Sequence, residues 1–190
     1  MGGVITFIHQ SSFIIHYSSQ VLQTQRLFLL PSNAEMLHAA VEEDWPTLSR
    51  LLGGVDFAHN WTHFPEALVW MRDYLQDSPQ ETKWWNYLFI LRSEARLVGS
   101  GGFKGPPEPD GSVELGYEIA DDYQGRGLAT EAARAMADWA AQQSGVTALT
   151  AHTLAEENAS TAILRKLGFA FVEEKVDLED GRIWAWRRAV

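Results

Sequence analysis

The residues between positions 114 and 132 have the types and spacing most suggestive of chemistry. They read ELGYEIADDYQGRGLATEA, so a strand pattern runs into a loop with glycines at 125 and 127 and then into an amphipathic helix from Leu128. Backbone N–H groups in the first turn of a helix have no intrahelical acceptor, and that end carries about half a positive charge. Glycines let such a backbone approach a bulky anion closely. The segment therefore predicts a cradle for a phosphate or pyrophosphate, against the alternative of a glycine-containing helix start that binds nothing.

Two common nucleotide-binding motifs do not fit this segment. A P-loop requires Gly-Lys-Ser/Thr, whereas residues 127–129 are Gly-Leu-Ala, which excludes ATP binding by that motif. The dinucleotide fingerprint requires an acidic residue about 20 positions downstream, and residues 146–148 are Val-Thr-Ala. A nicotinamide or flavin ligand is therefore disfavoured.

Composition excludes further classes. The 190 residues include 15 Lys and Arg against 25 Asp and Glu, which gives a net charge of −10. This balance argues against a nucleic-acid partner and suits a cationic or amine-bearing one. The absence of cysteine excludes disulfide scaffolds, thiolate metal sites and thiol catalysis, and it permits the reducing cytoplasmic location that we expect. No apolar run approaches about 18 residues, so no membrane span is predicted.

The elements that would position the segment alternate between helices and strands. Helices are predicted at residues 34–43, 44–53, 65–76, 128–142 and 158–166. Strands are predicted at residues 26–30, 84–91, 96–104, 112–120 and 146–154, followed by a hairpin that turns at Asp180-Gly181. This pattern indicates one α/β domain over residues 24–190. Residues 1–23 are predicted to be an amino-terminal extension, either disordered or packed.

Several motifs resemble those of the GNAT N-acetyltransferase superfamily. The run Gln124-Gly125-Arg126-Gly127-Leu128-Ala129 is similar to the superfamily signature Gln/Arg-x-x-Gly-x-Gly/Ala, which binds the pyrophosphate of acetyl-CoA. A second superfamily motif resembles Asn158-Ala159-Ser160-Thr161 with Leu164-Arg165-Lys166-Leu167-Gly168-Phe169. The RimJ/RimL-like branch of ribosomal-protein N-terminal acetyltransferases resembles the chain at Arg26-Leu27-x-Leu29, Leu97-Val98-Gly99-x-Gly101-Gly102 and Glu114-Leu115-Gly116-Tyr117. Together these matches extend from about residue 24 to the carboxyl end.

The resemblance implies a fold, a co-substrate and a set of binding residues. The fold is α/β (α+β), a mixed and strongly bent sheet of about six or seven strands flanked by about four helices, with the fourth and fifth strands splayed apart. The co-substrate is acetyl-CoA, no metal is needed, and the pantetheine arm lies in the splay. The implied binding residues are Ile119 and Ala120 beside the pantetheine, then Gln124, Gly125, Arg126, Gly127, Leu128, Ala129, Thr130 and Asn158.

Acetylation of an ammonium group requires a base, or a water chain that leads to one. Strand alternation places Glu114, Gly116 and Glu118 on one face, where the glycine leaves space between two carboxylates. The resemblance implies Glu114 as the base and leaves Glu118 as the second candidate. The alternative is that Glu114 is a solvated or salt-bridged strand residue.

The departing thiolate requires a hydrogen bond or a proton. Many superfamily members have a tyrosine at the position of Leu164, so this sequence departs from the pattern and lacks that acid. The resemblance implies that Ser160 contacts the coenzyme sulfur, with simple helix capping as the alternative. Asn158 resembles an asparagine on the pantetheine side, although its spacing to the serine is one residue shorter than usual.

Other histidines and the tryptophans are weaker candidates. His59 and His63 lie four residues apart but lack the zinc-protease pattern and a third ligand, so no metal site is predicted there. His152 lies on the predicted fifth strand, where a packed or exposed histidine is favoured over one facing the cleft. Trp45 and Trp61 are candidates for lining the acceptor cleft, by analogy with related enzymes. Four tryptophans on periodic elements are predicted to be mostly core: Trp70, Trp84, Trp85 and Trp139.

The resulting expectation is an acetyl-CoA-dependent N-acetyltransferase that acts directly on a primary amine. The acceptor would be a peptide or protein amino terminus, or a small amine, and the protein a monomer or homodimer. Two alternatives remain open: a non-catalytic acyl-CoA-binding module on the same fold, and an acyltransferase that uses a different acyl-CoA.

Overall fold

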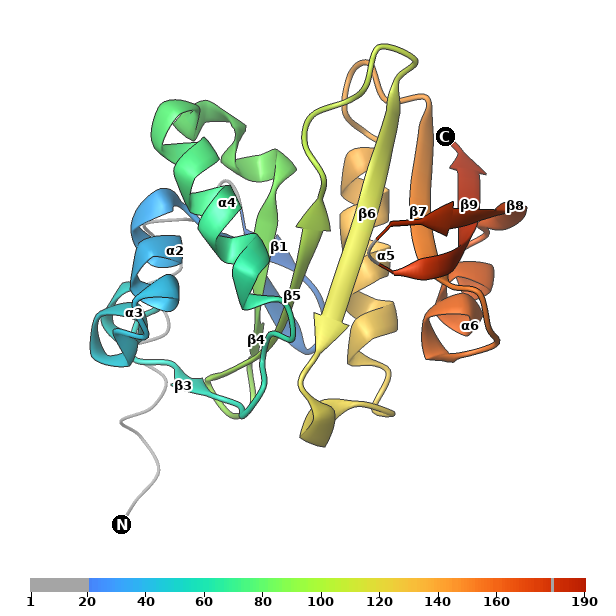
Figure 1. The fold of residues 1–190 in the computed structure, drawn as a ribbon. Coiled ribbons are helices and arrows are strands. Elements are labelled where there is room, and N and C mark those ends of the chain that lie inside the picture. Colours follow the sequence, from blue (N-terminus) through green and yellow to red (C-terminus); the bar gives the residue numbers. More distant parts are fainter. Residues whose placement is uncertain (1–20, 179) are drawn as a thin grey trace.

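Nine strands form one sheet in the part of the chain that the computed structural model describes, residues 21–178 and 180–190 (Figure 1). Two strands have only two residues, β1 (Leu22–Gln23) and β3 (Asp56–Phe57). The longer strands are β2 (Leu27–Pro31), β4 (Asn86–Leu91), β5 (Arg96–Phe103), β6 (Ser112–Ile119), β7 (Ala148–Leu154), β8 (Ala170–Asp177) and β9 (Gly181–Ala189). The helices are α2 (Ala34–Val41), α3 (Trp45–Leu51), α4 (Pro65–Asp77), α5 (Leu128–Ala140) and α6 (Ala159–Lys166), with 3₁₀ turns η1 (Pro79–Trp84) and η2 (Asp121–Tyr123).

The centre of the sheet contains an opening between two strands. The strand order is β1, β2, β4, β5, β6, β7, β9, β8, and β3 pairs with β5 outside this path. β6 runs parallel to β7, but their pairing ends at Glu114 and Thr150 after three residue pairs, although both strands continue. We call the space beyond that pair the β6–β7 opening. It confirms the mixed sheet with splayed strands that the resemblance implied.

The two faces of β6 lie in different surroundings. Val113, Leu115 and Ile119 are buried and belong to the hydrophobic core, and α5 packs against this strand. Figure 1 shows α5 behind β6 and α4 in front of the sheet. Because side chains alternate along a strand, the even-numbered residues of β6 face the front, on the side of α4. We call the surface around Glu114, Gly116 and Glu118 the even face.

Local sequence explains where the helices beside the opening begin. Gly127 precedes α5 with a φ of 77°, a left-handed conformation that favours glycine, and α5 starts at Leu128 as predicted. Asn158 precedes α6 and accepts a hydrogen bond from the backbone N–H of Thr161, while the Thr161 hydroxyl accepts one from the backbone N–H of Asn158. This reciprocal cap satisfies two backbone donors and fixes where α6 begins.

The structure differs from the sequence expectations in several details. The strand predicted from Trp84 begins at Asn86, because the preceding residues form η1. The five predicted helix ranges all contain α-helices, where the resemblance implied about four, and the sheet has nine strands in the described residues rather than about six or seven. The short strand β1 extends the sheet to a position before residue 24. Trp70 was expected in the core but is 55% exposed. The expectations for residues 1–20 lie outside the described residues. Within the described residues, no helix has the length and apolarity needed to cross a membrane.

Candidate active site

The start of α5 offers a set of unpaired backbone donors. The backbone N–H groups of residues 125–130 have no acceptor within the described part of the chain, and no side chain caps this helix there. Gly125 and Gly127 both have positive φ values, 70° and 77°. A Cβ added to Gly125 would meet no atom within 4 Å. The loop therefore presents bare, positively polarised backbone to open space, which is the requirement for binding a phosphate group.

The ion pair between Arg26 and Glu131, which was not predicted from the sequence, holds this loop in place. Arg26, just before β2, donates from Nε to Glu131 Oε2 at 2.7 Å and from Nη1 to the carbonyl of Arg126 at 2.8 Å. The Glu131 carboxylate also accepts from the backbone N–H of Arg26 and from the hydroxyl of Thr24. Burial opposes ionisation of Glu131, but these hydrogen bonds outweigh it and lower the pKa of its carboxyl. A guanidinium group therefore lies beside the loop, held in place by an ionised carboxylate.

The side chains of Gln124 and Arg126 act on the loop itself. Gln124 donates from Nε2 to the carbonyl of Ile119 at 3.0 Å and to Asp121 Oδ1 at 3.1 Å. Arg126 stacks over the ring of Tyr123 at 4.6 Å and donates to a carbonyl within the same turn. Both side chains have protein partners, so in this structure they shape the loop, and its backbone remains available to a ligand.

The backbone of β6 presents polar groups to the opening at alternate residues. The N–H of Lys104 donates to the carbonyl of Glu114, and the N–H of Ala120 donates to the carbonyl of Val98, so even-numbered residues bond to β5. The carbonyl of Ala120 accepts from the backbone N–H of Tyr123, so both backbone groups of Ala120 already have protein partners. By the alternation of an antiparallel ladder, the groups of Tyr117 and Ile119 point the other way, into the β6–β7 opening.

On the even face, Glu114 lies between two nitrogen groups. Lys104 Nζ is 2.5 Å and His152 Nδ1 is 3.1 Å from the same oxygen, Glu114 Oε1. Burial opposes ionisation of this carboxyl, but the hydrogen bonds from Lys104 and His152 outweigh it and hold the pKa of Glu114 below its usual range. Glu114 is therefore an ionised and paired carboxylate, a poor proton acceptor. Neither Lys104 nor His152 was identified as its partner from the sequence.

The second carboxylate of the even face, Glu118, is held by four contacts. Its Oε1 accepts from the hydroxyls of Thr62 at 2.7 Å and Ser100 at 2.9 Å, and its Oε2 accepts from the backbone N–H of His63 at 2.7 Å. The His63 ring also approaches Oε2 at 3.2 Å. Glu118 thus fastens the segment before α4 to the sheet. A Cβ added to Gly116, between the two carboxylates, would meet nothing within 4 Å.

At the start of α6, the structure brings Ser160 close to the strand that lines the opening. The Tyr117 hydroxyl donates to the backbone carbonyl of Ser160 at 3.4 Å, and burial raises the pKa of this phenol. Leu164, at the position where many superfamily members have a tyrosine, is buried in the core. Asn158 uses its side-chain oxygen in the helix cap. A protonated phenol therefore stands close to α6, although α6 itself contributes no tyrosine.

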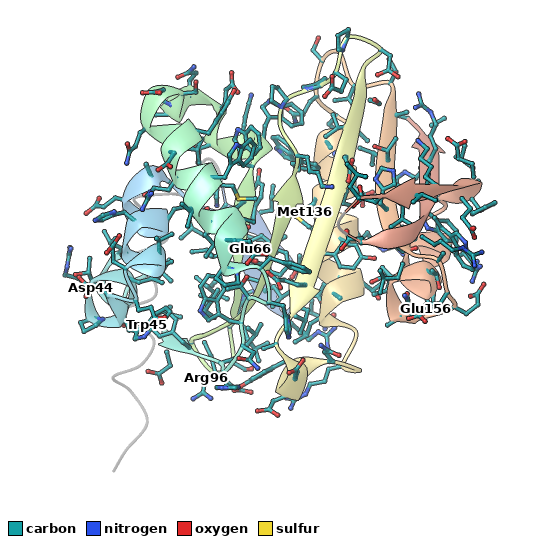
Figure 2. The ribbon with its side chains drawn as sticks, viewed as in Figure 1. Asp44, Trp45, Glu66, Arg96, Met136 and Glu156 are labelled. Carbon is teal, nitrogen blue, oxygen red and sulfur yellow. The ribbon has the colours of Figure 1, made fainter. Side chains whose placement is uncertain are left out.

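Trp45 and Trp61 line one cavity of about 240 Å³ between α2, α3 and the start of α4, together with Thr62 and Glu66. Figure 2 shows Trp45 on α3 and Glu66 on α4. Thr62 joins this cavity to the even face, since its hydroxyl donates to Glu118. Within residues 21–178 and 180–190, no group of three or more His, Cys, Asp or Glu side chains is arranged to hold a metal ion.

Comparison with known proteins identifies the family. Residues 36–170, more than half of the chain, match the acetyltransferase (GNAT) domain. The chain is 27% identical over 151 residues to the uncharacterized N-acetyltransferase YjdG of Bacillus subtilis (strain 168), which covers 78% of this chain and 89% of that protein.

Solved structures show the same fold. The ribosomal-protein-S5-alanine acetyltransferase of Vibrio fischeri has a TM-score of 0.65 at 13% identity, covering 89% of this chain and 96% of its own. RimL, a ribosomal L7/L12 alpha-N-protein acetyltransferase in complex with coenzyme A, has a TM-score of 0.63 at 13% identity, covering 90% and 98%. The resemblance drawn from the sequence motifs is thereby confirmed at the level of the family. The chain belongs to the GNAT family of acetyl-CoA-dependent N-acetyltransferases.

Proposed function

We propose that this protein transfers the acetyl group of acetyl-CoA directly to a primary amine bound on the even face of β6. The observation that carries this proposal is the β6–β7 opening. Unpaired backbone donors lie at the start of α5 beyond one end of β6, whereas two carboxylates, Glu114 and Glu118, flank the open space at Gly116. A donor and an acceptor could therefore approach the same opening from opposite faces of the sheet.

The donor would be held mainly by backbone groups. The N–H groups of residues 125–130 would bind the pyrophosphate, with Gln124 and Arg126 keeping the loop in shape. The opening-facing backbone groups of Tyr117 and the N–H of Ile119 would pair with the pantetheine arm, whereas the Ile119 carbonyl already accepts from Gln124. The sulfur would then lie toward the start of α6, where Ser160, Asn158 and the Tyr117 hydroxyl are found.

The acceptor would be recognised as a cation. The whole chain has a net charge of −10, and the even face carries the carboxylates Glu114 and Glu118, so an ammonium group is attracted before it loses its proton. Both acceptor classes predicted from the sequence, a small amine and a peptide amino terminus, have this chemistry. The fold likeness to acetyltransferases of ribosomal proteins makes amino-terminal peptides the first class to test.

An acetylation screen tests the proposal. Purified protein would be incubated with acetyl-CoA and a panel of alkylamines, polyamines and peptides with free amino termini, while thiol release is followed and products are identified by mass. We expect at least one acceptor to gain an acetyl group on nitrogen in step with thiol release. Binding of coenzyme A without thiol release for any amine would contradict the proposal and favour a non-catalytic acyl-CoA-binding module. Faster turnover with a longer acyl-CoA would favour a different acyl group.

A further inference from the structure

We propose that His152 is the general base of the transfer and that Glu114 is the residue that positions it. This inference rests on the proposed acetylation of an amine, and it assigns the proton acceptor to a different residue from the one expected from the sequence.

The geometry is that of a carboxylate–histidine pair. His152 Nδ1 lies 3.1 Å from Glu114 Oε1, and Lys104 Nζ lies 2.5 Å from the same oxygen. An ionised carboxylate only accepts hydrogen bonds, so it fixes the proton of a neutral imidazole on Nδ1 and leaves the lone pair on Nε2. Nε2 points away from Nδ1 and has no partner among the described residues, and the His152 side chain is 29% exposed. The ring therefore offers a free and oriented acceptor to an incoming molecule.

The chemistry favours the imidazole over the carboxylate as the proton acceptor. The pKa of Glu114 is held below its usual range by Lys104 and His152, and a base becomes weaker as the pKa of its conjugate acid falls. Histidine is the side chain that most often serves as a general base, because its neutral ring carries a lone pair that accepts a proton reversibly. The same ionised Glu114 stabilises the imidazolium that forms when the proton is accepted.

The strand register places His152 at the mouth of the opening. The last pair between β6 and β7 joins Glu114 to Thr150. Two residues further along each strand lie Gly116 and His152, on the same face as Glu114 and on opposite sides of the opening. A Cβ on Gly116 would meet nothing within 4 Å, so the space directly over Gly116 is empty of protein. An amine in that space would reach both Nε2 and a thioester carbonyl presented through the opening.

The proposed step conserves atoms and charge. His152 Nε2 accepts one proton from the bound ammonium, and the amine lone pair forms a C–N bond to the thioester carbonyl carbon. The C–S bond then breaks, and the thiolate leaves with the bonding electrons. A second proton from the nitrogen reaches the sulfur, and the proton on His152 passes to solvent. The products are an amide and coenzyme A with a free thiol.

The other charged groups on the same face have carboxylate or cationic partners of their own. By the register of β9 and β8, Arg187, Glu173 and Lys175 share the face of His152. Arg187 lies 3.8 Å from Asp110, and Lys175 lies 3.1 Å from Glu173. Within the described residues, Glu114 is the carboxylate at ion-pair distance from the imidazole, with Lys104 on its other side. Glu114 is therefore the group that can orient the imidazole through Nδ1.

Kinetics of His152→Ala test the base, with His38→Ala on the exposed surface of α2 as the matched control. We expect kcat/KM for the amine to fall by roughly 10²–10⁴-fold in His152→Ala, while KM for acetyl-CoA and the activity of His38→Ala stay unchanged. Added imidazole should restore part of the lost rate, and substituted imidazoles should restore it in the order of their basicity. Activity of His152→Ala within about twofold of wild type, or a loss that no imidazole rescues, would overturn the assignment.

A second measurement separates this inference from the proposed function. Long-range ¹H–¹⁵N spectra of the free protein report which ring nitrogen carries the proton. We expect neutral His152 to carry it on Nδ1 in the wild type and to shift toward Nε2 in Glu114→Gln. We also expect kcat/KM for the amine to fall in that variant while KM for acetyl-CoA stays unchanged, because the ring is no longer held in the tautomer that leaves Nε2 as the acceptor. Failure of every amine in the screen would refute the proposed function alone, whereas a proton on Nε2 in the wild type would refute the positioning by Glu114.

Discussion

Gly127→Glu should abolish coenzyme A binding. It should also lower the free energy of unfolding by an amount that can be measured separately from binding. Gly127 has a φ of 77°, and a non-glycine residue in that conformation costs about 1–2 kcal/mol. A Cβ there would meet Arg26 Nη2 at 3.5 Å, an ordinary contact, so the fold accommodates the side chain. The same guanidinium would attract the new carboxylate and hold it over the unpaired N–H groups of residues 125–130, where the pyrophosphate is proposed to bind.

Gly145→Glu is the matched control at the other end of α5. Gly145 has a φ of 87° and open space around its Cβ, so the strain is similar while the cradle is untouched. For a domain of this size, 1 kcal/mol corresponds to about 2–4 °C in Tm, so both variants should melt roughly 2–8 °C below wild type. Coenzyme A at 100 times its Kd adds about 2.7 kcal/mol of stability, which raises Tm by roughly 5–11 °C.

A thermal melt with and without coenzyme A provides the assay, with calorimetric titration as confirmation of affinity. We expect the ligand-induced rise in wild type and in Gly145→Glu, and none in Gly127→Glu. An unchanged rise in Gly127→Glu would refute the reasoning, because it would place the pyrophosphate away from the start of α5. Loss of the rise in both variants would equally refute it, because strain alone would then explain the effect.

Three further changes have distinct expected outcomes. Glu118→Gln replaces a charged acceptor of three hydrogen bonds with a neutral amide, so urea denaturation should show a loss of about 1.5–3 kcal/mol in the free energy of unfolding. Ser160→Ala should lower kcat and leave the Kd for acetyl-CoA nearly unchanged, as measured by steady-state kinetics and titration; the reverse pattern would make Ser160 a binding residue only. Because hydrogen bonds, including those from Arg26, lower the pKa of Glu131 in the folded state, its contribution to stability is present above the ordinary value of 4.5 and is lost as the pH falls below it. Glu131→Gln should therefore flatten the acid side of the stability profile, and an unchanged slope would contradict the role of this pair.

The features that the sequence predicted well are those encoded within one short segment. The loop from Gln124 to Thr130 and the start of α5 depend on glycines at fixed positions and on helix periodicity, and both are local properties. The alternation of β6 likewise predicted which of its side chains are buried. The N-caps of α2 and α6, Asn33 and Asn158, are local features too, but the helices were predicted from the sequence without either cap being identified.

The features that the sequence could not predict join residues that are distant in the chain. Arg26 meets Glu131 across 105 positions, and no pattern in either segment indicates the other. Glu114 meets His152 because β7 leaves β6 just beyond this point, and that divergence shows in neither strand by itself. Trp70 fits the helix periodicity but lies at the edge of the buried stripe, where its ring packs against Trp85 at 4.8 Å and stays exposed.

The β6–β7 opening also divides the sheet into two units that can unfold separately. Within the described residues, the strands from β1 to β6 and the strands β7, β9 and β8 form two hydrogen-bonded ladders that share three residue pairs. Units joined so sparsely tend to open separately, so amide hydrogen exchange in the carboxyl-terminal ladder should report a lower opening free energy than in the ladder from β2 to β6. A ligand in the opening whose amides replaced the missing pairs would act as a short additional strand. Binding of this ligand would then join the two cooperative units into one. The unfolding transition would become steeper as its midpoint rises.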